Sequence, residues 1–205
     1  MKIAIIGAGN VGGALGRRWH EAGHDVTFGV REPSSEKCKD LEGKMEGIEA
    51  AVRGAEIVVL ATPWDAAEDA VRTCGDLSGK VLVDCTNPLR PNLAGLTHGH
   101  DDSGGEQVAR WATGAKVVKA FNTVGFNIME NPRLEDRRAV LFVCGDEDGK
   151  AAVRLLSDAL GFETVDAGPL ERARILEPFA LLWITAAYRM GLGRDFAFSL
   201  IRRDG

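Results

Sequence analysis

The fold of this chain is decided by the stretch Lys2-Ile3-Ala4-Ile5-Ile6-Gly7-Ala8-Gly9-Asn10-Val11-Gly12. Residues 2–6 form an apolar run of strand length, which is typical of a strand buried on both faces. Residues 13–19 then follow a helical pattern. A strand, a glycine turn and a helix in this order are the context in which the pattern G-x-G-x-x-G predicts a dinucleotide site.

Each glycine of the turn has a physical task. Gly7 permits the tight turn, Gly9 lets the backbone approach a pyrophosphate, and Gly12 lets the helix pack close to the strand. The helix, opening at Asn10 or Val11, offers unpaired N–H groups and the positive end of its dipole to the phosphates. The plainer alternative is a turn that only joins a strand to a helix. The second strand that follows at residues 25–30 disfavours this alternative.

Composition and charge exclude several classes of protein. The chain has 205 residues, of which 45% are hydrophobic and 27% charged, and its net charge is −5. These values predict a globular protein without a broad basic face for nucleic acid or an anionic membrane. Neither a membrane span nor a signal peptide is apparent, so we expect a cytoplasmic protein. The cysteines at 38, 74, 85 and 144 have no regular spacing, which disfavours a disulfide or zinc framework.

Buried strands alternate with helical segments along the chain. Strands are predicted at residues 2–6, 25–30, 56–61, 80–85, 116–121, 137–144 and 162–166, with a brief one within 43–47; helices are predicted at 35–41, 48–52, 64–72, 105–112 and 148–160. This alternation predicts an α/β fold with a doubly wound (Rossmann), mostly parallel sheet, whose strand order begins 3-2-1-4-5-6. A small helical carboxyl-terminal part follows the sheet.

The residues after the second strand bear on cofactor preference. An acidic side chain here takes the ribose 2′-hydroxyl of NAD, whereas an arginine accommodates the 2′-phosphate of NADP. Arg31 is therefore the predicted phosphate clamp. Ser34, Ser35 and Lys37 in the following loop are candidates to supplement it, and a solvated polar loop is the plainer alternative for all three. Glu32 is the rival, because it lies at about the offset expected of the acidic residue. The sequence favours NADP but leaves Glu32 open as the specificity residue.

Polar residues follow three later strands, in the segments Thr62-Pro63-Trp64, Asn87-Pro88 and Asn122-Thr123. Ligands bind at the carboxyl edge of such a sheet, so these residues predict a pocket for the nicotinamide carboxamide and a substrate. Trp64 either covers the cofactor or begins the next helix. The loop with His98 and His100 is interpreted as an active-site loop, and we predict no metal site there because further ligands at suitable spacing are missing.

Several motifs carry a resemblance to a known family. They are Gly7-Ala8-Gly9-Asn10-Val11-Gly12, Gly29-Val30-Arg31, Thr86-Asn87-Pro88-Leu89, Ser103-Gly104-Gly105-Glu106, Lys119-Ala120-Phe121-Asn122-Thr123 and Asp166-Ala167-Gly168-Pro169-Leu170. Together they resemble the NADPH-dependent coenzyme F420 reductases (F420:NADP oxidoreductases), and also the oxidoreductase domain of the STEAP metalloreductases. The similarity covers nearly the whole chain. One departure is Val30, where the family often has a serine or threonine.

The resemblance implies a Rossmann domain at residues 1–168 that holds NADP, and a helical segment at 169–205 that helps to form a cleft. A deazaflavin (coenzyme F420) or a flavin would stack on the nicotinamide there as hydride acceptor. The implied cofactor contacts are Asn10 and Arg31 at the 2′-phosphate region, Thr62 and Pro63 at the middle, and Asn87, Phe121 and Asn122 on the nicotinamide side.

The residues agree with this chemistry. No Ser-His-Asp arrangement and no nucleophile beside a base is recognisable, and hydride transfer between two stacked rings needs neither. We therefore predict an NADP-dependent oxidoreductase and name no catalytic side chain. The alternatives are an NADPH-binding sensor without activity and a dehydrogenase of a small substrate. The latter is expected to need a larger helical domain.

The segment 170–190 is strongly apolar. We expect Pro178 to start or kink a helix whose stripe of Phe179, Leu182, Trp183 and Ala186 packs on the sheet. Its other side, with Leu181 and Ile184, would pack against a second copy of the chain, forming a homodimer. Burial of both sides within one copy is the alternative.

Overall fold

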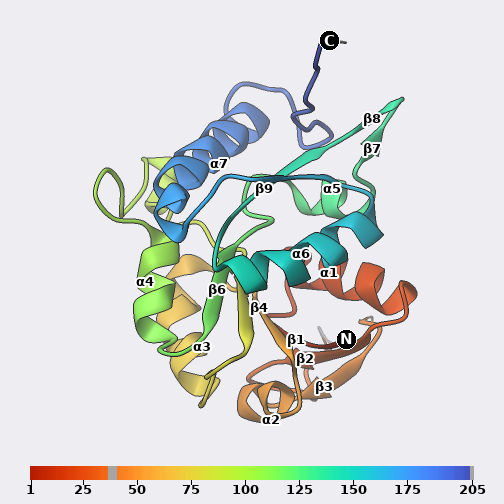
Figure 1. The fold of residues 1–205 in the computed structure, drawn as a ribbon, viewed down its shortest axis with the longest axis vertical. Helices are drawn as coiled ribbons and strands as arrows, with labels where there is room; N and C mark the ends of the chain where they lie inside the picture. Colours follow the sequence, from red (N-terminus) through yellow and green to blue (C-terminus); the bar gives the residue numbers. More distant parts are fainter. Residues whose placement is uncertain (37–40, 204–205) are drawn as a thin grey trace.

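The computed structural model describes residues 1–36 and 41–203. In this part of the chain an eight-stranded sheet lies between layers of helices (Figure 1). Its strands are β1 (Lys2–Ile6), β2 (Asp25–Gly29), β3 (Lys44–Glu46), β4 (Ile57–Leu60), β5 (Val81–Asp84), β6 (Lys116–Lys119), β9 (Val140–Gly145) and β10 (Glu163–Asp166). The strand order is β3-β2-β1-β4-β5-β6-β9-β10, and β9 is antiparallel to β6 while the other pairs are parallel. The predicted fold and strand order are confirmed.

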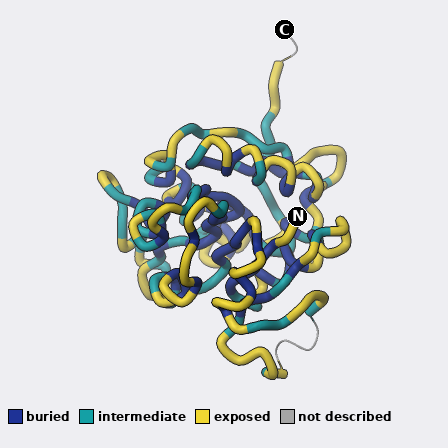
Figure 2. The backbone as a smooth tube through the Cα atoms, turned by 60° about the horizontal axis from the view of Figure 1, so that its bottom comes forward, coloured by how far each residue is buried: buried dark blue, intermediate teal, exposed yellow. Residues whose placement is uncertain are grey.

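The two faces of the sheet have separate cores. The helices are α1 (Asn10–Glu21), α2 (Ile48–Arg53), α3 (Ala67–Thr73), α4 (Gly104–Trp111), α5 (Phe126–Glu130), α6 (Glu147–Leu160) and α7 (Ala173–Tyr188), with the short 3-10 helices η2 (Trp64–Ala66), η3 (Pro91–Leu93) and η4 (Leu170–Arg172). Ile3 and Ile5 of β1 pack in the core of α1 and α6, whereas Ala4 and Ile6 pack in the core of α2, α3 and α4. Alternate side chains of a strand point to opposite faces, so β1 is buried on both. Figure 2 shows that buried residues gather at the centre of the molecule.

Most predicted elements are present, with altered limits. The third strand and the helix at 48–52 are confirmed, and the helix expected at 64–72 begins with the 3-10 turn η2. The single strand expected at 137–144 is wrong. It divides into β8 (Arg137–Arg138), which pairs with β7 (Arg133–Leu134), and β9. Between them the N–H of Ala139 donates to the carbonyl of Pro132 at 2.7 Å. The helix expected at 35–41 includes residues 37–40, which lie outside the described residues. Lys37, named above as a supplement to the phosphate clamp, is one of them.

The prediction of where the carboxyl-terminal helix begins and which of its side chains are buried is partly wrong. Pro178 does not start the helix, because α7 begins at Ala173 and continues through the proline. Trp183 and Ala186 are buried as expected, but Leu182 is 53% exposed and Ala180 lies in the core instead. Nearly every position of this helix is apolar, so periodicity could not identify its buried face. The pairing of its outer side with a second copy stays a prediction.

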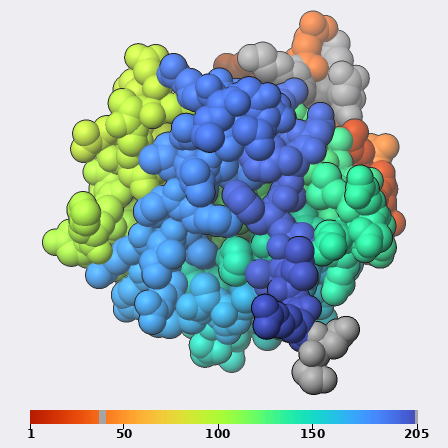
Figure 3. Space-filling view, turned by 90° about the horizontal axis from the view of Figure 1, so that it is seen from above, coloured from red at the N-terminus to blue at the C-terminus, as the bar shows by residue number. Residues whose placement is uncertain are grey.

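The segment after α7 folds back over the molecule and is held by aromatic contacts. The indole of Trp183 stacks on Phe196 with ring centroids 5.2 Å apart, and Phe179 meets Phe198 at 4.7 Å. The N–H of Val140 in β9 donates to the carbonyl of Phe198 at 2.9 Å. In Figure 3 this blue segment covers the middle of the face seen from above. The last described residues therefore form part of the layer that covers this end of the sheet.

The approach of α1 to β1 gives a prediction about stability. A Cβ atom at Gly12 would lie 2.0 Å from the backbone oxygen of Gly7 and 3.1 Å from the Cγ2 atom of Ile5. We expect Gly12→Ala to lower the free energy of unfolding by about 1–3 kcal/mol, the usual effect of overpacking. Thermal unfolding measures this loss. Gly54→Ala is the control, because its Cβ atom would meet nothing within 4 Å; equal melting temperatures for both variants would contradict the close-contact argument.

Candidate cofactor-binding site

The glycine turn leaves the first turn of α1 without side-chain caps. The helix begins at Asn10, as predicted, and the N-cap residue Gly9 is extended (φ −83°, ψ −168°) and makes no capping hydrogen bond. No acidic residue lies in the first turn. The first N–H groups of a helix lack intrahelical partners and carry the positive end of its dipole. The turn therefore presents a set of donors that suits a pyrophosphate.

The shape of the turn leaves one side open. Gly7 has φ +112°, a conformation that favours glycine, and a Cβ atom there would lie 2.6 Å from the backbone oxygen of Ala61. A Cβ atom at Gly9 would meet nothing within 4 Å. Gly7 is thus constrained by the protein, whereas the surface of Gly9 is free for the approach of a ligand. Both observations fit the tasks expected of these glycines, although their contacts with a cofactor stay predictions.

Arg31 and Glu32 follow one residue after the end of β2, which lies beside β1 in the sheet. Both are exposed, and neither side chain makes a hydrogen bond or ion pair with another described residue. Asn10 is also exposed, at the start of α1, while Val11 packs against the core. This side of the turn is where a Rossmann fold holds the adenosine half of its ligand. An unpaired guanidinium there is available for a bidentate contact with phosphate.

At the end of β4, Thr62 lies against the glycine turn, with its Cγ2 atom 3.4 Å from the position of a Gly7 Cβ. Its hydroxyl oxygen is buried and has no hydrogen-bond partner in the described structure, and Pro63 is exposed. Trp64 packs on Trp111 at a centroid distance of 5.4 Å and on His98 at 5.5 Å. Of the two alternatives for Trp64, the structure therefore supports packing at the start of a helix.

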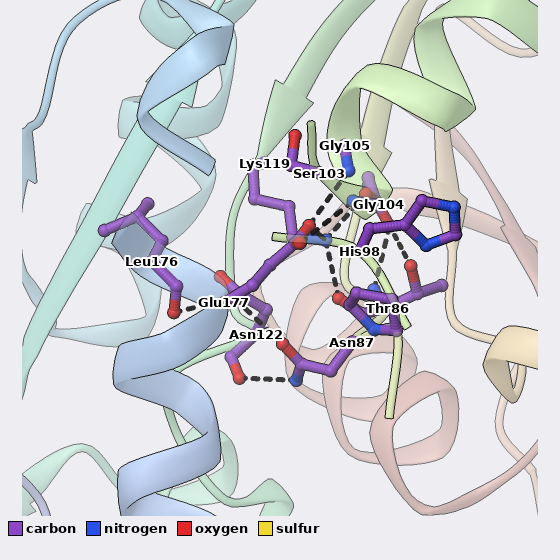
Figure 4. Close-up of polar contacts among 12 residues, drawn as sticks. Thr86, Asn87, His98, Ser103, Gly104, Gly105, Lys119, Asn122, Leu176 and Glu177 are labelled. Atoms are coloured by element: carbon purple, nitrogen blue, oxygen red, sulfur yellow. Dashed lines mark hydrogen bonds and ion pairs between the residues drawn. The ribbon is translucent and has the colours of Figure 1, made fainter. Parts of the chain in front are cut away.

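Two amides meet at the next pair of strand ends. The side-chain N–H of Asn87 donates to the backbone oxygen of Asn122 at 2.9 Å, and that of Asn122 donates to the side-chain oxygen of Asn87 at 3.1 Å (Figure 4). The side-chain oxygen of Asn122 and the hydroxyl of Thr123 are buried without a partner among the described residues. A buried acceptor left unpaired costs about 1–3 kcal/mol. A ligand with N–H donors, such as a carboxamide, would satisfy these atoms.

Phe121 does not offer its ring at this edge. It is fully buried, between Trp19 at a centroid distance of 5.7 Å and Phe162 at 6.0 Å. Its backbone is left-handed (φ +62°), an uncommon conformation for a bulky residue. The chain turns at Phe121 between β6 and Asn122. The ring therefore has a structural role in the core, and the cofactor contact that the resemblance implies for Phe121 stays a prediction that falls to its backbone.

Directly behind the two amides lies a buried charge cluster that the sequence reasoning missed. The Lys119 ammonium lies 2.8 Å from the carboxylates of both Asp84 and Glu177. Burial alone lowers the pKa of Lys119, but the two carboxylates outweigh it and raise the pKa above its usual value. Asp84 and Lys119 are register partners on β5 and β6. Opposite charges within two apolar strands were the available signal, whereas nothing local connects Glu177 to them.

Other chemistry finds little support in the described residues. Burial raises the pKa of the Cys74 and Cys144 thiols to about 12, so both stay protonated near neutral pH. No group of three His, Cys, Asp or Glu side chains suited to a metal occurs in residues 1–36 and 41–203. The imidazole of His98 is hydrogen-bonded to Thr97 at 2.9 Å. None of the helices described has the length and apolar character needed to span a membrane.

Comparisons with known proteins identify the family of this chain. The family described as "NADP oxidoreductase coenzyme F420-dependent" matches residues 2–88. The F420-dependent NADP reductase of Methanocaldococcus jannaschii is 31% identical over 209 residues, which cover 90% of this chain and 91% of that protein. A crystal structure from Arthrobacter sp. FB24, assigned as an F420-dependent NADP reductase, has a TM-score of 0.89 at 32% identity and covers 98% of this chain and 100% of its own.

Metalloreductase STEAP3 of Rattus norvegicus is 29% identical over 184 residues, or 88% of this chain. The match covers 36% of STEAP3, so the chain spans about a third of that relative. The methanogen reductase, by contrast, matches over nearly the full length of both proteins. The chain therefore belongs to the NADP oxidoreductases of the F420-dependent NADP reductase family.

Proposed function

We propose that this NADP-dependent oxidoreductase transfers hydride between NADPH and a planar ring acceptor. The deazaflavin coenzyme F420 is the first candidate and a flavin the second. The observation that carries the proposal is the full-length similarity to the F420-dependent NADP reductase of the methanogen. NADPH, when bound, supplies the hydride, so the protein has to bind and orient rather than to provide a nucleophile.

The residues present fit such a cofactor. The uncapped first turn of α1 binds the pyrophosphate, and Arg31 binds the 2′-phosphate. The unpaired oxygens of Thr62, Asn122 and Thr123 take hydrogen bonds from the ribose and the carboxamide. Buried polar atoms are normally paired, so three orphans along one sheet edge support a polar ligand there.

The acceptor is tested by offering F420, FMN, FAD and a ferric chelate in turn and following the oxidation of NADPH by its absorbance. We expect turnover with F420 or a flavin and little with the ferric chelate alone, since the proposal requires a ring that accepts hydride. Inactivity with every ring acceptor, in a preparation that binds NADPH, would contradict the proposal and support an NADPH sensor.

Cofactor preference is tested with Arg31→Ala. Loss of a charge-assisted contact with the 2′-phosphate should cost about 1.5–3 kcal/mol, a roughly 10- to 150-fold weaker Kd for NADPH. The affinity for NADH should not change. Calorimetric titration measures both ligands, and Arg53→Ala on α2, whose side chain is 77% exposed, is the matched control. If the wild type prefers NADH, or Arg31→Ala retains its NADPH affinity, Glu32 becomes the specificity residue.

The open surface of Gly9 is tested with Gly9→Ala. The added methyl group meets no protein atom within 4 Å, so folding should be nearly unaffected, but it occupies the space where a pyrophosphate approaches. We expect NADPH binding to weaken by about 1–3 kcal/mol, as for other cases of overpacking. Gly47→Ala is a close control, because Gly47 is the N-cap of α2 and is equally open. Unchanged NADPH affinity in Gly9→Ala would mean that the phosphates bind elsewhere.

A further inference from the structure

A cluster of three charged side chains lies next to the strand ends that carry Asn87 and Asn122, and it is almost completely shielded from solvent. The side chains of Lys119, Asp84 and Glu177 are 0%, 0% and 1% exposed. The ammonium also donates to the backbone oxygen of Thr86 at 2.6 Å. Figure 4 shows Glu177 reaching from α7 toward Lys119 and the start of α4. Burying charged groups costs desolvation free energy even when the groups are paired, so this cluster is not explained by stability alone.

The start of α4 balances the cluster. Two carboxylates and one ammonium leave one net negative charge, and the N–H groups of Gly104 and Gly105 each donate to Glu177 at 2.9 Å. These are the first residues of α4, where the helix dipole is positive. A Cβ atom at Gly104 would lie 3.0 Å from the Glu177 carboxylate. Because both residues are glycines, the Glu177 side chain of α7 can approach and cap the start of α4, although the two helices are far apart in the sequence.

The cluster is joined to both amides of the edge. The carboxylate of Asp84 accepts from the backbone N–H of Thr86 at 2.9 Å and from its hydroxyl at 2.7 Å. Together with the Lys119 contact, this fixes the residue that precedes Asn87. On the other side, the backbone oxygen of Leu176, next to Glu177, lies 3.5 Å from the side-chain N–H of Asn122. One buried network thus borders the two residues that meet at the site.

We propose that Glu177 is a positioning residue for the nicotinamide half of the cofactor, acting through Lys119 and α7 on Asn87 and Asn122. The Glu177 carboxylate is already engaged by Lys119 and by the N–H groups of Gly104 and Gly105, so its role is to position other residues rather than to bind a ligand. The adenosine half, held on the Arg31 side of the glycine turn, lies outside the reach of this network. The inference rests on the NADPH site of the proposed function but not on the identity of the acceptor.

The test compares two ligands in the wild type and in Glu177→Gln. NADPH has both halves, whereas adenosine 2′,5′-bisphosphate lacks the nicotinamide. The glutamine keeps the shape of the side chain, but it is uncharged, and its NH2 group replaces one carboxylate oxygen and faces other donors. We expect NADPH to bind about fivefold more weakly, the equivalent of one hydrogen bond at the site. The bisphosphate should bind with unchanged affinity, and the fluorescence of the bound nicotinamide should change.

Two further variants separate positioning from general stability. Asp166→Asn breaks another ion pair of a buried lysine, since Lys150 is 6% exposed and lies 2.7 Å from Asp166, which is 41% exposed. This variant should change neither ligand's affinity. Arg174→Met removes the second tie between α7 and α4, a bidentate contact with Glu106 that is partly exposed. Arg174→Met replaces Glu177→Gln as the test variant if the latter does not fold. It should weaken NADPH binding alone by about twofold, which is less than the free energy of one hydrogen bond.

The outcomes are distinct. Weaker binding of NADPH alone supports the positioning role. Equal weakening of both ligands, or no change in either with normal thermal unfolding, would overturn it and leave the cluster a structural element. A wild-type protein that binds the bisphosphate but not NADPH would instead refute the proposed function. Calorimetry without any acceptor gives all of these results.

Discussion

The arrangement of the site depends on the way the fold accommodates one ammonium group, that of Lys119, in its interior. Removing a charge from water costs several kcal/mol, and only close partners of opposite charge offset this. Here the partners come from β5, from α7 and from the loop after β5. Each is separated from Lys119 along the chain. The ammonium therefore ties the sheet edge to the carboxyl-terminal helix, and loss of Glu177 would break this tie while Asp84 still balances the ammonium charge.

Some hydrogen-bonding atoms at the strand ends next to this cluster have no partner in the described structure. Asn87 and Asn122 satisfy part of each other's hydrogen-bonding capacity, while the side-chain oxygen of Asn122 and the hydroxyl of Thr123 have no partner among the described residues. Buried polar atoms are normally paired, so these unpaired atoms favour a ligand that brings hydrogen-bond donors. A ligand of this kind agrees with the proposed function, in which the cofactor carries the chemistry.

The sequence was most informative about backbone constraints and strand burial. The glycine pattern placed the start of α1, and the apolar runs placed the parallel strands in their correct order, because both signals come from neighbouring residues. The positions at the ends of strands were also predictable, since parallel strands bring their carboxyl ends to one edge. Asn87 and Asn122 were therefore expected to be close, and their side chains do meet.

Other features could not be recognised in the local pattern. The Phe121 ring belongs to the core because the left-handed turn directs the chain there, and no local pattern announces such a turn. The buried face of α7 was ambiguous because an almost wholly apolar helix has no contrasting side. The partnership of Lys119 with Glu177 arose only when α7 folded back on α4. Local sequence specified the sheet and the turn. Contacts between distant segments created the charge cluster and brought Asn87 to Asn122, because burial and pairing depend on the neighbours that folding brings together.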